Sequence, residues 1–196
     1  MKTLVKLALI ASLSTSAIAG ELNYNRTLVV ADSLGAAASS WPQQLQAIDS
    51  SLNVQNNAQG GRKTGDVDLP RDVRCGGWFG GRDCVVLLAL GSNDTEYTNL
   101  KIASGTRRLI DQAKLLGAVP IIVLPPVHKN SPDMERVRKY ITRAAGQRNV
   151  RVIDLENVWD DSRLTDGVHP NASLSQDVAF YIYDELIRIK AELGVE

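Results

Sequence analysis

Histidine and cysteine are scarce in this sequence: a chain of 196 residues contains only two of each. Zinc sites draw their ligands mainly from these two residue types and usually combine four of them at close spacing. His128, His169, Cys75 and Cys84 are not spaced as such a set. The sequence therefore predicts no metal centre, and no cofactor motif is present either.

A surplus of charge of either sign is also missing. Lysine and arginine together number 22, and so do aspartate and glutamate. Proteins that bind nucleic acids usually carry a basic excess that contacts phosphates. We therefore expect no nucleic-acid partner.

Two widespread motifs of nucleotide and ester chemistry are absent. The chain has no Gly-x-Ser-x-Gly sequence, which argues against the α/β-hydrolase fold. The glycines at Gly60-Gly61-Arg62-Lys63-Thr64 are too closely spaced for a phosphate-binding P-loop.

Long hydrophobic runs are lacking, and the one near the N-terminus is short. It extends from Leu7 to Leu13, whereas a membrane-spanning helix needs roughly 20 residues. Lys2 and Lys6 precede or border it, and the small-x-small sequence at 17–19 follows it. This pattern predicts a cleaved signal peptide over residues 1–19 and a mature protein in the periplasm or the medium, with no transmembrane segment. A buried N-terminal helix is the alternative.

The two cysteines fit an oxidising compartment. Cys75 and Cys84 bracket a glycine-rich segment, and exported proteins commonly pair such residues. A disulfide closing so short a loop stabilises the fold by roughly 2.5 kcal/mol in the chain-entropy model. The alternative is two unpaired thiols, with Cys84 beginning a buried strand.

Apolar runs alternate with amphipathic stretches over residues 20–196, which have the length of a single domain. The alternation predicts an α/β fold with three layers, in which helices cover both faces of a five-stranded parallel sheet of flavodoxin-like order. The expected strands are Thr27–Ala31, Leu52–Gln55, Cys84–Leu90, Val119–Leu124 and Val150–Leu155. The expected helices begin at Trp41-Pro42, cover Lys101–Leu116, run from Ser131-Pro132 towards Gly146, and cover Ala172–Leu193.

Four short polar segments stand at the ends of these elements. Three of them follow predicted strands, and the fourth precedes the last helix. Because parallel strands end at the same rim of a sheet, the fold should bring all four together. They are Ala31-Asp32-Ser33-Leu34, Asn57-Ala58-Gln59-Gly60-Gly61, Gly91-Ser92-Asn93-Asp94 and Asp166-Gly167-Val168-His169-Pro170-Asn171.

These segments contain the groups that serine-dependent ester hydrolysis requires. A serine hydroxyl needs a base within hydrogen-bond reach. His169 is the histidine that has a carboxylate three residues before it, Asp166, which can orient its ring. We therefore expect Ser33 to be the nucleophile, His169 the base and Asp166 its orienting partner.

The developing negative charge on the substrate's carbonyl oxygen also needs fixed donors, each worth roughly 3–4 kcal/mol. The backbone amides of Ser33 and Gly61 and the side-chain amide of Asn93 would supply three donors from three loops. Gly60 is the alternative to Gly61 in this oxyanion hole.

The set as a whole resembles the SGNH (GDSL-type) hydrolases, whose name gives their serine, glycine, asparagine and histidine. The corresponding residues here are Ser33, Gly61, Asn93 and His169, with Asp166 as the acidic member. The resemblance covers nearly the whole mature chain and is strongest to small bacterial esterases of the thioesterase I and lysophospholipase L1 kind. One departure is Ala31, where the family usually has glycine.

Simpler roles for single residues remain open at this point. Ser33 could be a helix cap, and Asn93 an ordinary turn residue. Asp32 and Asp94 fit structural acceptors better than catalytic groups. His128 lies in the loop after the fourth strand, which borders the expected site; it is expected to be a solvated loop residue, with contact to the substrate as the alternative.

The resemblance implies hydrolysis of carboxylic esters or thioesters, including small-molecule and lipid acyl esters, through an acyl-enzyme on Ser33. The short apolar loop from Leu34 to Ala38 favours acyl substrates. Removal of acetyl groups from carbohydrates is one alternative, and a non-catalytic binding protein of the same fold is the other.

Overall fold

Five short strands alternate with helices along the chain and carry its core. The structure is a computed structural model that describes residues 26–69, 84–129, 131 and 133–192. The strands are β1 (Arg26–Ala31), β2 (Asn53–Asn56), β3 (Val85–Ala89), β4 (Val119–Leu124) and β5 (Arg151–Asp154). The helices are α1 (Trp41–Ile48), α3 (Asn99–Leu115), α4 (Met134–Gly146) and α5 (Ala172–Glu192), with short 3-10 turns η1 (Ser33–Gly35), η3 (Leu155–Asn157) and η4 (Asp161–Arg163).

The strands form one parallel sheet in the order β2-β1-β3-β4-β5. The chain passes outward from β1 to β2 and then crosses back to add β3 on the other side of β1. The direction of winding therefore reverses between β1 and β3. In sheets of this kind, ligands bind beyond the carboxyl ends of the two strands that flank this reversal.

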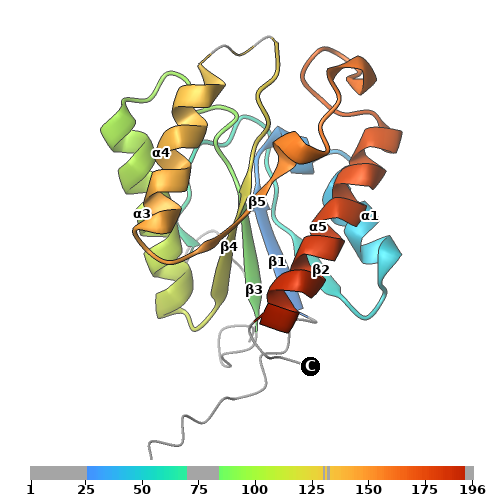
Figure 1. Ribbon diagram of the computed structural model, residues 1–196, viewed down its shortest axis with the longest axis horizontal. Coiled ribbons are helices and arrows are strands. Elements are labelled where there is room, and N and C mark those ends of the chain that lie inside the picture. The colour runs from blue at the N-terminus through green and yellow to red at the C-terminus, as the bar shows by residue number, and fades with distance from the viewer. Residues whose placement is uncertain (1–25, 70–83, 130, 132, 193–196) are drawn as a thin grey trace, which may run out of the picture.

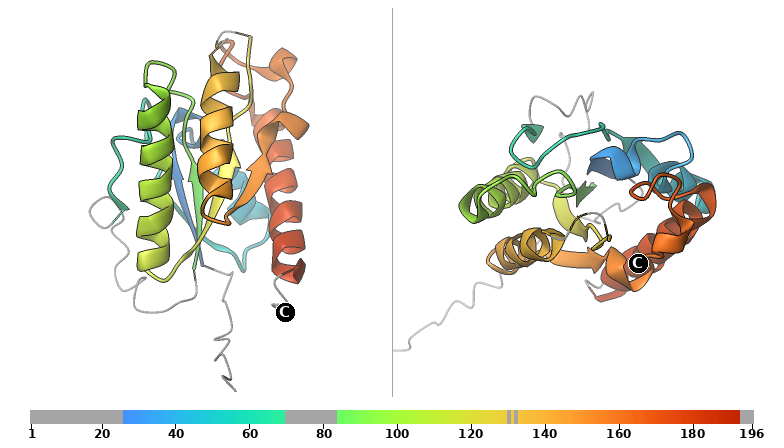
Figure 2. Two further views of the ribbon diagram at one scale, coloured as in Figure 1. Left: turned by 60° about the vertical axis from the view of Figure 1, so that its left-hand side comes forward. Right: turned by 90° about the horizontal axis from the view of Figure 1, so that it is seen from above.

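Alternating side chains of each buried strand face two separate layers of helices. On β1, Leu28 and Val30 belong to the apolar cluster that α3 and α4 complete, whereas Val29 and Ala31 belong to the cluster completed by α1 and α5. Figures 1 and 2 show the two helix pairs on opposite faces of the sheet. The predicted three-layer, flavodoxin-like fold is confirmed.

The ends of two helices differ from the sequence-based expectation. Helix α3 begins at Asn99, two residues early, because the hydroxyl oxygen of Thr98 accepts a hydrogen bond from the amide of Lys101 (3.3 Å) and caps the first turn. Helix α4 begins only at Met134, whose amide donates to the carbonyl of Ser131 (3.0 Å) in a turn that precedes the helix.

Two expectations concern residues that the structure does not describe. The signal peptide over 1–19 lies outside the described ranges, and so does Cys75. Cys84 is buried and lies immediately before β3, which begins at Val85 rather than at Cys84 as expected. The Cys75–Cys84 disulfide is not confirmed and stays a prediction. None of the helices in the described ranges has both the length and the apolar character needed to cross a bilayer.

Candidate active site

Ser33 lies directly beyond the carboxyl end of β1, at the point where the winding of the sheet reverses. The amide of Asp32 donates to the carbonyl of Ala89 on β3 (3.3 Å), which extends the pairing of β1 and β3 to the edge of the sheet. Asp32 then caps the turn η1, since its Oδ1 accepts from the amide of Leu34 (3.1 Å). The half-buried Ser33 is thus the first residue of a turn anchored on both sides.

Alanine is accommodated at position 31 without backbone strain. Among the described residues only Asn149 is a non-glycine residue with a positive φ, so Ala31 keeps an ordinary strand conformation. Its methyl group packs against Gly35, where an added Cβ would lie 2.9 Å from the Cβ of Ala31. The departure from the usual glycine therefore requires a glycine four residues later, a coupling that the sequence reasoning missed.

Two buried carboxylates hold the loops around Ser33. Asp32 is 1% exposed, and its Oδ2 accepts from the amide of Ser92 (3.2 Å) after β3. Asp94 is fully buried, and its two oxygens accept from the amide (3.1 Å) and the hydroxyl (2.5 Å) of Thr64 in the loop after β2. Burial raises the pKa of Asp32 to about 6 and also raises the pKa of Asp94.

The predicted oxyanion donors Gly61 and Asn93 lie on neighbouring loops that are in contact. The side-chain Nδ2 of Asn93 donates to the carbonyl of Arg62, the residue after Gly61 (3.2 Å). Gly61 has φ +72°, a conformation that favours glycine, whereas Gly60 is not among the glycines with positive φ. This difference favours Gly61 over Gly60 as the position that demands glycine.

An arginine that sequence reasoning did not identify holds the backbone of the segment that follows Gly61. Arg108 of α3 donates through Nη2 to the carbonyls of Thr64 (3.2 Å), Gly65 (3.1 Å) and Val67 (2.7 Å). The sequence around a helical arginine does not show whether its side chain hydrogen-bonds distant backbone carbonyls or is solvated.

The predicted base and its orienting carboxylate are joined directly. Oδ2 of Asp166 lies 2.7 Å from Nδ1 of His169, and Oδ1 accepts from the amides of His169 (2.8 Å) and Val168 (3.0 Å). Gly167 has φ +82°, which lets the chain turn back between the two residues. The hydrogen bond from the His169 amide is the largest of the contacts that hold the pKa of Asp166 far below its usual range, followed by that from the ring.

The loop that carries His169 is closed on itself before α5 begins. The amide of Thr165 donates to the carbonyl of His169 (2.8 Å), and the amide of Asn171 donates to the carbonyl of Arg163 (2.9 Å). Asn171 also caps α5, because its Oδ1 accepts from the amide of Leu174 (2.9 Å). With Nδ1 engaged by Asp166, Nε2 is the ring nitrogen that remains for proton transfer.

The structure brings Asp166 to His169 and the Gly61 loop to Asn93, and it places Ser33 in η1 at the carboxyl end of β1. Within the described part of the chain, no hydrogen bond joins the Ser33 hydroxyl to His169. Such contacts are often long in a serine enzyme without substrate and tighten when substrate binds.

His128 differs from expectation: it is buried, with 6% of its surface exposed, rather than solvated. Its Nδ1 is buried and has no hydrogen-bond partner among the described residues. Burial is the main cause that lowers the pKa of His128; the nearby His169 lowers it further, and Asp161 opposes the shift. The ring is therefore neutral at neutral pH.

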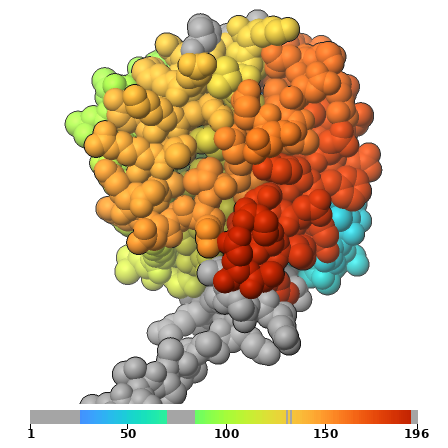
Figure 3. Space-filling view, viewed as in Figure 1, coloured from blue at the N-terminus to red at the C-terminus, as the bar shows by residue number. Residues whose placement is uncertain are grey.

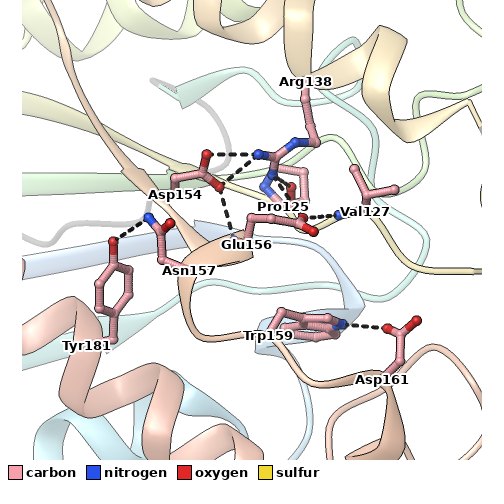
Figure 4. A network of polar contacts seen from close by, with 9 residues as sticks. All are labelled: Pro125, Val127, Arg138, Asp154, Glu156, Asn157, Trp159, Asp161 and Tyr181. Atoms are coloured by element: carbon pink, nitrogen blue, oxygen red, sulfur yellow. Dashed lines mark hydrogen bonds and ion pairs between the residues drawn. The ribbon is translucent and has the colours of Figure 1, made fainter.

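A network around Arg138 joins the loops that follow β4 and β5 (Figure 4). Nη2 of Arg138 donates to both carboxylate oxygens of Asp154 (2.8 Å each), and Nη1 donates to the carbonyl of Pro125. Glu156, two residues beyond Asp154, accepts from the amide of Val127 (2.7 Å).

In the described ranges no group of three or more histidine, cysteine, aspartate or glutamate side chains is arranged to hold a metal ion.

Comparison with solved structures shows the same fold in several esterases. The chain is similar to the psychrotrophic esterase EstA from Pseudoalteromonas sp. (TM-score 0.69, 18% identity, covering 84% of this chain and 97% of that chain). It is also similar to TesA (TM-score 0.68, 20% identity, 82% and 97%). A third is the acetyl xylan esterase AlAXEase (TM-score 0.67, 17% identity, 82% and 98%).

A search of curated proteins finds no match. The family model described as GDSL-like Lipase/Acylhydrolase family matches residues 21–176, which is most of the chain and includes each of the predicted site residues. The chain therefore belongs to the GDSL-like lipase/acylhydrolase family and is a serine hydrolase of ester bonds.

Proposed function

We propose that this protein hydrolyses carboxylic esters or thioesters of acyl groups through an acyl-enzyme on Ser33. The observation that carries the proposal is the pair of His169 and Asp166, whose Nδ1 and Oδ2 atoms lie 2.7 Å apart in the loop before α5, together with Ser33 at the start of the turn η1 that follows β1. A carboxylate bound to Nδ1 fixes the ring so that Nε2 accepts a proton. Because the hydrogen bonds from His169 hold the pKa of Asp166 far below its usual range, this carboxylate is ionised at neutral pH.

In the first half of the reaction, the Oγ of Ser33 bonds to the carbonyl carbon of the ester while its proton passes to Nε2 of His169. The electron pair of the carbonyl moves onto its oxygen. When that pair returns, the bond to the leaving group breaks, and the alcohol or thiol takes the proton from His169. A water molecule then attacks the acyl-enzyme by the same steps and releases the acid.

The negative charge on the carbonyl oxygen would be met by three donors from three loops. These are the amides of Ser33 and Gly61 and the Nδ2 of Asn93. The contact between Asn93 and the carbonyl of Arg62 supports this role, because it fixes two of the three donor-bearing loops against each other (3.2 Å).

A fatty-acyl chain is a better candidate for the group transferred to Ser33 than the acetyl group of a carbohydrate ester. Ala36, Ala37 and Ala38 follow the nucleophile and are exposed, so the surface next to Ser33 is small and apolar. A carbohydrate would instead need several polar side chains beside the nucleophile. Fatty-acyl esters and thioesters are therefore the proposed substrate class.

A series of p-nitrophenyl esters from acetate to palmitate tests the proposal with the wild-type protein and Ser33→Ala. We expect hydrolysis by the wild type and a loss of roughly 10⁶-fold in kcat in the variant. A rate that rises with chain length would support fatty-acyl substrates, whereas a maximum at acetate would favour acetyl removal.

Ser39→Ala is a matched control, because Ser39 is an exposed serine in the same loop. It should retain wild-type activity, and an alkylphosphonate should attach to Ser33 in both the wild type and this control. Equal activity of wild type and Ser33→Ala, or labelling at another serine, would contradict the assignment of the nucleophile.

A further inference from the structure

The backbone on both sides of His128 is held in place by hydrogen bonds. It follows β4, and its two flanking backbone amides are each held by a carboxylate from the β5–α5 connection. The amide of Val127 donates to Glu156 (2.7 Å), and the amide of Lys129 donates to Asp161 (3.3 Å). Figure 3 shows the β4–α4 and β5–α5 connections side by side at the top of the molecule, and Figure 4 shows Val127 of the first beside Glu156 of the second.

The same connection carries the predicted base. Asp161 lies in η4 with Arg163, and the carbonyl of Arg163 accepts from Asn171, two residues beyond His169 (2.9 Å). The contacts that hold the backbone of His128 therefore also set its distance from His169. The charge of His169 is among the causes that lower the pKa of His128, which agrees with this proximity.

The hydrogen-bonding groups of the His128 ring are not used by the fold. Nδ1 is buried without a partner among the described residues. A buried acceptor without a partner is tolerated better than a buried donor without one, so the proton of the neutral ring is assigned to Nε2. Nε2 is not among the buried atoms that lack a partner, and no described residue hydrogen-bonds it, so it is the nitrogen through which the ring reaches the surface.

A buried polar ring that contributes no hydrogen bond to the fold calls for another explanation. The connection that holds the backbone on both sides of His128 also carries His169, which delivers a proton to the departing alcohol in the proposed mechanism. A donor at this place faces the alcohol part of the substrate rather than the acyl part.

We propose that His128 is a specificity-determining residue that donates a hydrogen bond from Nε2 to a hydroxyl group of the leaving alcohol. The preferred substrates are then acyl esters of polyols, in which a free hydroxyl lies close to the ester oxygen. This inference rests on the proposed function and adds the class of the leaving group to it.

The test compares two esters that share an acyl group and a three-carbon alcohol skeleton: a glyceryl monoester and the corresponding propyl ester. The acyl group is the one that the wild type hydrolyses fastest. The quantity measured is the ratio of kcat/KM for the glyceryl ester to kcat/KM for the propyl ester. In His128→Phe, which keeps a ring but loses the donor, this ratio should fall about three- to tenfold.

Two further variants separate a hydrogen bond from packing. The amide of glutamine reaches the place of Nε2, whereas that of asparagine reaches only the place of Nδ1, so His128→Gln should restore much of the ratio and His128→Asn should not. Lys129→Ala is the matched control, because its exposed side chain is removed and its backbone amide is kept. It should leave the ratio unchanged.

Equal losses on both esters in His128→Phe would overturn this inference while leaving the esterase function intact. The same conclusion would follow if the wild type hydrolysed the glyceryl ester no faster than the propyl ester, a result that needs no variant to fold. If the wild type hydrolysed neither ester nor any member of the p-nitrophenyl series, the proposed function would fail, and this inference with it.

Discussion

The aspartates beside the proposed oxyanion donors and the aspartate beside the predicted base differ in burial and in the direction of their pKa shifts. On the oxyanion side, Asp32 and Asp94 are 1% and 0% exposed, and burial raises the pKa of both. On the side of the base, the side chain of Asp166 is 57% exposed, and hydrogen bonds hold its pKa far below the usual range. The pKa values of aspartates are thus shifted in opposite directions within one site.

The difference shows what each side requires. The proposed oxyanion donors are mostly backbone amides, which can be positioned only by fixing loops, and a buried acceptor does this by binding the amides of neighbouring loops. Asp32 binds the amide of Ser92, and Asp94 binds that of Thr64. The base needs instead a partner that stays negative while its ring becomes positive, and an exposed, well hydrogen-bonded carboxylate meets that need.

Among the tests of this contrast between carboxylates, the largest effect should come from Asp166→Asn. Its carbonyl oxygen can still accept from the amides of Val168 and His169, so the turn survives. Its amide, however, would donate to Nδ1 of His169 and place the ring proton on Nε2, where the base must be free. We expect kcat to fall roughly 10³- to 10⁴-fold with little change in thermal stability.

Asp160→Asn is the control for that change. Asp160 is another carboxylate at the surface of the β5–α5 connection, and its Oδ1 accepts from the amide of Ser162 (2.9 Å). This variant should keep wild-type kcat. An Asp166→Asn protein as active as Asp160→Asn would show that the pairing with His169 does not orient a base.

Asn93→Ala should have the next largest effect, on the oxyanion side. Removing one donor to a developing oxyanion typically lowers kcat by roughly 10²- to 10³-fold, with KM little changed. Steady-state kinetics on the best p-nitrophenyl ester measures this. Asn99→Ala removes an exposed amide side chain at the start of α3, whose Oδ1 accepts from Arg136 (3.0 Å), and should be close to wild type. If both alanine variants behaved alike, Asn93 would be only a turn residue.

Much of this arrangement could be predicted from the sequence, because it depends on local chemistry. The nearly continuous apolar runs of β3 and β4 indicate strands buried on both faces, and a parallel sheet brings their carboxyl ends to one rim. The pairing of Asp166 with His169 is local as well, since it spans three residues and a glycine that permits the turn. The fold and this pair were therefore accessible without a structure.

What the sequence could not predict depends on side chains that are remote along the chain. Arg108 and Arg138 reach loops after β2 and β4 from the helices α3 and α4, and nothing in their immediate sequence distinguishes them from solvated arginines. His128 was expected to be solvated because it lies in a loop. Its burial results from contacts with the β5–α5 connection, about 30 residues further along the chain, which a local reading cannot include.

The smallest predicted effect is on stability rather than activity, and it concerns Asp32. Its pKa is raised from 3.8 to about 6 in the folded protein, so the folded state binds a proton more tightly than the unfolded chain. The contribution of this group to stability is therefore fully present below about pH 4 and is lost as the pH rises through 6. Each unit of pKa shift corresponds to about 1.4 kcal/mol, so the total is up to about 3 kcal/mol.

Asp32→Asn cannot titrate, so the difference between wild-type and variant unfolding free energies isolates this group. Urea unfolding at intervals from pH 4 to pH 7 should show the wild type losing up to about 3 kcal/mol relative to the variant. The absolute stability of the variant is a separate matter, because asparagine keeps the acceptor for Leu34 but presents an amide to the Ser92 N–H. Asp160→Asn, at an exposed carboxylate, should show no such relative change. A wild-type curve parallel to that of Asp32→Asn would mean that Asp32 is ionised as easily as Asp166, and the contrast between the two sides of the rim would not hold.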